Sequence, residues 1–177
     1  RDGESGYRNL ALAVESIEDN RFSGSLDHFT LAYKTFSRGA EDISSWGGAL
    51  VDIASFVPGF SKVASGKYAL LAGQHFAAAG IPLARVAEEL SFSKETRAQG
   101  NTVSLLDFLM RIKIPLATAL VELEAGNQAL EKIEIGDIPE EKRDTFLLVR
   151  QNLPVLIGLI QKFEQNEALL EELLGGN

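Results

Sequence analysis

Apolar and polar positions follow a helical period along most of this chain. The longest regular pattern runs from Leu26 to Val57, where apolar or small residues recur in alternating steps of three and four. Such spacing places them on one face of a helix. The pattern stops at Pro58-Gly59, a pair that breaks helices. The positions are Leu26, Phe29, Tyr33, Phe36, Ala40, Ile43, Gly47, Leu50, Ala54 and Val57.

The remaining segments also predict helices. A short helix is expected over residues 5–20, and a helix from Ser61 to Leu90 completes a first hairpin over 25–90. The polar stretch 91–102 predicts a linker, and a second hairpin follows over 103–175 with its turn before Pro139. The residues expected to face the core are Tyr7, Leu10, Val14 and Ile17, then Leu109, Ile112, Leu116, Leu120, Leu123 and Leu130, then Phe146, Val149, Leu153, Leu156, Ile160, Phe163, Leu170 and Leu174.

These patterns define the expected fold class. No segment alternates apolar and polar residues with the period of two that strands require. We therefore predict a single all-α domain over 1–177, an elongated bundle of about five helices built from long antiparallel hairpins.

Glycines recur every seven residues in the middle of the chain. Each internal glycine costs a helix about 1 kcal/mol relative to alanine, so we expect a compensating close contact with a neighbouring helix. The functional alternative to packing within the chain is a self-association seam between two copies. The residues assigned to close helix packing are Gly47, Gly59, Gly66, Gly73 and Gly80.

The same region has no formal charge from Tyr68 to Ala84. Small residues at such spacing are common in membrane helices. However, the run is shorter than the about 20 residues that a span needs, and it contains Gln74, His75 and Pro82. A central, covered helix explains it better, and we predict no membrane span in this chain.

Three prolines lie inside predicted helices. Proline removes a backbone donor and tends to kink a helix, so we assign kinks to Pro82, Pro115 and Pro154. Pro115 and Pro154 lie at similar distances on either side of Gly136. We therefore expect the second hairpin to bend as a unit.

Charge and composition narrow the function classes. The formal net charge is -8, which argues against nucleic acid and anionic lipid as partners. The chain has no cysteine, so disulfides and thiolate metal sites are excluded. Neither histidine, His28 or His75, belongs to a metal-binding motif. We interpret His75 as a packed or hydrogen-bonded core histidine.

No catalytic motif was found. Acidic pairs such as Glu140-Glu141 point about 100° apart on a helix and do not converge. No phosphate loop, dinucleotide fingerprint or nucleophile elbow is present. We expect a chain that is not an enzyme and that has no cofactor or metal, with a protein partner or self-association as its mode of action.

Several stretches together form a recognisable pattern. They are Leu26-x-x-Phe-x-x-Ala-x-x-x-Phe up to Phe36, then Val57-Pro58-Gly59, then Gly66-Lys-Tyr-Ala-Leu-Leu-Ala-Gly, then Ala79-Gly-Ile-Pro-Leu, and finally Leu173-Leu174-Gly175.

This pattern resembles the helical region of an uncharacterised bacterial family, domain of unknown function 4012. The resemblance implies an extracytoplasmic envelope protein with a membrane anchor upstream of this helical piece, which would itself be soluble. The family's Arg-Pro-Thr-Gly-Gly-Phe type motif is absent, so no site residue is carried over. Alternatives are a soluble scaffold or a ligand-sensing bundle; a tetratricopeptide-like adaptor is weaker, because no 34-residue period continues.

Overall fold

The described parts of the chain form long α-helices. The computed structural model describes residues 2–45, 61–99 and 104–173, and no strand occurs in these ranges. The fold is an all-α bundle, as the sequence predicts. The elements are α1 (Asp2–Glu18), α2 (Phe22–Ser45), α4 (Ser61–Ala98), α5 (Leu105–Glu131), the short 3-10 helix η1 (Ile135–Asp137) and α6 (Glu140–Leu173).

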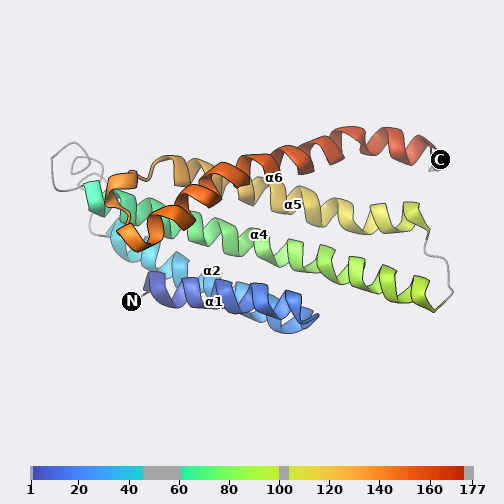
Figure 1. The fold of residues 1–177 in the computed structure, drawn as a ribbon, viewed down its shortest axis with the longest axis horizontal. Coiled ribbons are helices and arrows are strands. Elements are labelled where there is room, and N and C mark those ends of the chain that lie inside the picture. Colours follow the sequence, from blue (N-terminus) through green and yellow to red (C-terminus); the bar gives the residue numbers. More distant parts are fainter. Residues whose placement is uncertain (1, 46–60, 100–103, 174–177) are drawn as a thin grey trace.

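Helices that follow one another in the sequence pack against one another in space. α1 packs on α2, α2 on α4, α4 on α5, and α5 on α6 (Figure 1). α4 and α5 run in opposite directions, because Glu89 late in α4 pairs with Arg111 early in α5, while His75 pairs with Glu122. α4 lies in the middle of the molecule, with α1 and α6 along its two long edges (Figure 1).

The turn between α1 and α2 is set by one residue in the left-handed region. Asn20 has a φ of 57°, which asparagine tolerates better than most side chains. The N–H of Asn20 donates to the carbonyl of Ile17, and the N–H of Arg21 donates to that of Ser16 at 2.7 Å. This pair of bonds is a Schellman cap, which satisfies carbonyls at the end of α1 and lets α2 begin at Phe22.

The prediction of a linker over 91–102 is wrong for most of this stretch. α4 continues to Ala98 and is 38 residues long, about 57 Å at the α-helical rise. Lys94, Glu95 and Ala98 favour helix, and no glycine or proline intervenes before Gly100. Polarity in this stretch therefore marks exposure rather than a break in the helix.

The second hairpin begins and turns through specific caps. Ser104 caps α5, its hydroxyl accepting from the Asp107 N–H at 3.4 Å. After α5 the chain passes through η1, and the Arg143 side chain donates to the Ile138 carbonyl at 3.0 Å. α6 begins directly after Pro139, with Glu140 and Glu141 in its first turn, where negative charge is favourable.

The largest core cluster joins α4, α5 and α6. It places Ile157 rather than Leu156 in the interior, and Val149 is 39% exposed, so the buried face of α6 differs from the predicted one. α5 follows the prediction more closely. The buried members of this cluster are Ala72, Ala79, Leu120, Leu123, Ala129, Leu130, Ile133, Leu153, Ile157 and Ile160.

The face of α1 also differs from the prediction. Tyr7 and Val14 are 59% and 51% exposed, whereas Gly6 and Ala13 are buried. Small residues of α1 face α2 because the rings of α2 fill the space between the helices. The apolar period of α1 was therefore a poor guide to its buried side.

Two of the predicted packing glycines receive phenylalanine rings from α2. A Cβ built on Gly73 would lie 2.7 Å from the Phe36 ring, and one built on Gly80 would overlap the Phe29 ring. Gly66 differs, since no atom of the described residues lies within 4 Å of a Cβ built there, and close packing at Gly66 stays a prediction. Gly47 and Gly59 lie outside the described residues.

The three prolines lie within continuous helices. Pro82 is buried in α4, Pro115 is half-buried in α5, and Pro154 is exposed on α6. None of them ends its helix, and the predicted kinks stay predictions. Within the described ranges, no helix carries an apolar stretch long enough to cross a membrane.

Candidate functional site

Polar side chains connect neighbouring helices at several levels of the bundle. His75 Nδ1 of α4 lies 2.7 Å from Glu122 Oε2 of α5, and both side chains are about two-thirds buried. Gln161 of α6 donates to Glu124 of α5 at 2.7 Å. Each bond joins one helix to the next, which fixes their register.

A second connection holds the start of α4 against the turn before α6. The buried Ser65 hydroxyl donates to Asp137 Oδ2 at 2.7 Å and accepts from the Glu134 N–H at 3.3 Å. Nearby, Lys132 lies over the Tyr68 ring at 5.1 Å from its centroid, a cation–π contact. These contacts order the turn that carries η1.

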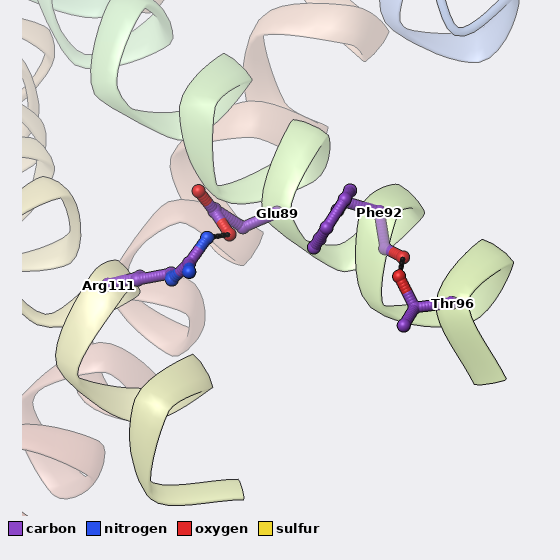
Figure 2. A network of polar contacts seen from close by, with 4 residues as sticks. All are labelled: Glu89, Phe92, Thr96 and Arg111. Atoms are coloured by element: carbon purple, nitrogen blue, oxygen red, sulfur yellow. Dashed lines mark hydrogen bonds and ion pairs between the residues drawn. The ribbon is translucent and has the colours of Figure 1, made fainter. Parts of the chain in front are cut away.

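The clearest hollow lies where α4 ends and α5 begins. Its volume is about 210 Å³, below the roughly 300–1,000 Å³ of typical ligand pockets. Figure 2 shows Arg111 of α5 reaching towards Glu89 of α4, an ion pair at 3.5 Å, and Thr96 donating to the Phe92 carbonyl. The lining residues are Glu89, Phe92, Ser93, Thr96, Ser104, Asp107, Phe108 and Arg111.

Several polar groups of this hollow already have partners within the fold. Ser104 and Asp107 form the N-terminal cap of α5, and the Thr96 hydroxyl bonds to its own helix. Among the described residues, no group of three or more His, Cys, Asp or Glu side chains could hold a metal ion. Phe92, 52% exposed, and Phe108 are the apolar residues that line the hollow.

The most distinctive surface is an apolar stripe on the outer side of α6. Leu148, Val155 and Leu159 are 61%, 61% and 60% exposed. Steps of seven and four residues place them on one line along the helix. We call these three residues the α6 stripe.

A second set of exposed apolar residues lies on α5. Met110, Ile114 and Val121 are 58%, 73% and 65% exposed and are separated by four and seven residues. We call them the α5 stripe. Surface apolar residues that gather in rows, rather than singly, mark contact sites for other macromolecules.

Sequence reasoning did not find these stripes. In α6, residues 146–149 are all apolar, as are 155–157 and 159–160, which is more than one buried face accommodates. This excess of apolar residues in the sequence of α6 could have indicated that some of them are exposed. Among the described helices α6 packs mainly on α5, which leaves a broad apolar sector of α6 exposed.

Comparisons of the chain with models of known families, with curated proteins and with solved structures find no match. The candidate site therefore stands on the geometry of this chain alone.

Proposed function

We propose that this chain is a non-catalytic structural and interaction module of a membrane-anchored protein of the bacterial cell envelope. The observation that carries the interaction role is the pair of exposed apolar stripes on α5 and α6. Their side chains lie on rigid helices rather than on loops, so they present a preformed surface. A partner protein that covers them would remove apolar area from water, the main favourable term in association.

The extracytoplasmic setting is supported by the sequence resemblance described above and by the absence of cysteine. The anchor is expected upstream of this helical piece. The net charge of -8 disfavours nucleic acid as the partner, because phosphate binding requires a basic face.

Protease shaving of intact cells that make the full-length protein tests the location. We expect the domain to be lost from intact cells while a cytosolic marker survives. Protection of the domain in cells whose wall admits the protease, followed by digestion after lysis, would refute the envelope setting.

The second candidate is a soluble scaffold or ligand-sensing bundle, which the hollow between α4 and α5 favours. Its test is a thermal-shift screen with small metabolites, repeated with Phe92→Ala and Arg111→Ala. A ligand-dependent rise in Tm that both variants abolish would favour sensing over a purely structural role.

A further inference from the structure

The outer surface of α6 carries an extended pattern with a charge at each end. Continuing the α6 stripe in steps of three or four residues adds Asp144 before Leu148 and Lys162 after Leu159, with Asn152 between Leu148 and Val155. Asp144, Asn152 and Lys162 are all exposed. The row runs from Asp144 to Lys162, 18 residue steps along the helix, which make five helical turns and about 27 Å.

This row is self-complementary in the antiparallel direction. The centre of the row is the peptide bond between Leu153 and Pro154. Leu148 and Leu159 lie at equal distances along the sequence on either side of this bond, and so do Asn152 and Val155. A two-fold axis at that peptide would place Leu148 opposite the Leu159 of a second copy. Isologous interfaces require such a match, in which each residue meets its counterpart twice.

The terminal charges obey the same symmetry. Asp144 lies one residue farther from that peptide bond than Lys162 does, and one residue corresponds to only about 1.5 Å along the helix. Being five turns apart, they lie on the same flank of α6, and matching flanks face each other in an antiparallel pair. Asp144 of one copy therefore meets Lys162 of the other at both ends of the row. In a parallel pair each Asp144 would instead lie level with the other Asp144, and each Lys162 level with the other Lys162, so opposite charges would not meet.

The position of α6 makes this pairing accessible. α6 forms one long edge of the molecule, with α5 as its main neighbour (Figure 1). Val149 and Leu156, 39% and 41% exposed, widen the apolar surface beside the row. A single helix pair of this length buries less than the roughly 800 Å² per partner of a standard interface, so the association is weak and depends on concentration.

We propose that the α6 row, from Asp144 to Lys162, is a homodimer interface whose partner is a second, antiparallel copy of the same helix. The inference rests on the proposed interaction role and names its partner. It concerns α6 alone and is independent of where in the cell the domain lies.

Sedimentation velocity of the domain at concentrations between about 1 μM and 1 mM tests the proposal. This range covers the dissociation constants of weak complexes. We expect a monomer–dimer equilibrium. Leu148→Glu should weaken it at least about tenfold, because the change occurs twice in each dimer. Val14→Glu on α1, at a side chain that is 51% exposed and lies outside both stripes, is the matched control and should leave the association unchanged. A monomer throughout this range, or dissociation by Val14→Glu alone, would overturn the proposal.

Charge reversal tests the register. Asp144→Lys should weaken the dimer by setting Lys against Lys at both ends, and Asp144→Lys combined with Lys162→Asp should restore it. Failure of the double variant to restore association would reject the antiparallel register.

Disulfide trapping tests the direction of the helices. The chain has no cysteine, so single cysteines are unambiguous. Leu148→Cys mixed with Leu159→Cys should oxidise to a mixed dimer faster than either variant alone, because disulfides need Cα atoms within about 7 Å. Faster self-linking of Leu148→Cys would indicate a parallel pair and reject the proposal. A monomer result would still leave the shaving experiment to decide the envelope setting.

Discussion

The ring of Phe36 lies between two glycines from different helices. A Cβ built on Gly6 of α1 would lie 2.6 Å from the ring, and one built on Gly73 of α4 would lie 2.7 Å from it. These separations are well inside van der Waals contact, so neither position has room for a methyl group. Phe36 thereby joins α1, α2 and α4 at one point, and its side chain is 5% exposed.

We expect Gly73→Ala to lower the free energy of unfolding by about 1–3 kcal/mol, because the added methyl displaces the ring of Phe36. Urea unfolding monitored by circular dichroism measures the change. Gly66→Ala is the matched control, since the same helix has open space there. In that variant the free energy of unfolding should rise by about 0.5–1 kcal/mol, because alanine has a higher helix propensity than glycine. Equal effects of the two substitutions would contradict the packing.

A double-mutant cycle tests the contact itself. In a Phe36→Leu background, the cost of Gly73→Ala should fall by at least about 0.5 kcal/mol, because the smaller side chain leaves room for the methyl group. Phe36→Leu alone should destabilise the fold through lost packing. Strict additivity of the two changes would mean that Gly73 and Phe36 do not interact.

Ser65→Ala removes one donor and one acceptor at the turn that carries η1. We expect a loss of about 1–3 kcal/mol, because the hydroxyl is buried and bonds both Asp137 and the Glu134 N–H. Ser37→Ala is the control, since that hydroxyl bonds only the Tyr33 carbonyl of its own helix, and it should change stability by less than about 0.5 kcal/mol. Thermal unfolding of the two variants side by side gives the comparison.

Two glutamates with nearly equal exposure should differ in how much they contribute to the free energy of unfolding. Glu122 lies 2.7 Å from His75, whereas Glu89 lies 3.5 Å from Arg111, whose side chain is 58% exposed. We expect Glu122→Ala to cost about 1 kcal/mol and Glu89→Ala less than about 0.5 kcal/mol. Denaturant titration at low and high salt checks this, and a larger loss at Glu89 would contradict the ranking.

Pro154→Ala should stabilise the domain. Pro154 is exposed inside α6, where proline gives up a helical hydrogen bond without an offsetting contact in the core. We expect a gain of about 1–3 kcal/mol. Pro139→Ala, directly before α6, should have little effect because proline suits the start of a helix. Unfolding by urea tests both, and a destabilised Pro154→Ala would show that α6 depends on the local geometry that proline imposes.

The sequence predicts the helices well because apolar periods and caps are local signals. Ser104 lies directly before α5 and caps it, and Pro139 lies directly before α6. The end of α4 was missed, because a polar surface such as Lys94-Glu95 has no apolar period whether it is helical or not. Local patterns also say little about which neighbour covers a face.

The choice of buried face needs the partner helix. Tyr7 was expected inside and is exposed, since Gly6 meets Phe36 instead. The same limit applies to the surface stripes. Leu148 and Leu153 are equally apolar, and only the position of α5 decides that Leu153 is buried.

The pairing of each helix with the next in sequence has a consequence for how the molecule forms. Contacts between sequence neighbours close short loops, which cost little chain entropy, and proteins rich in such contacts fold in microseconds to milliseconds. α1 and α2 can pair before α4 has been synthesised, and each later helix finds its site already present. The bundle can thus assemble stepwise from its N-terminus as the chain emerges.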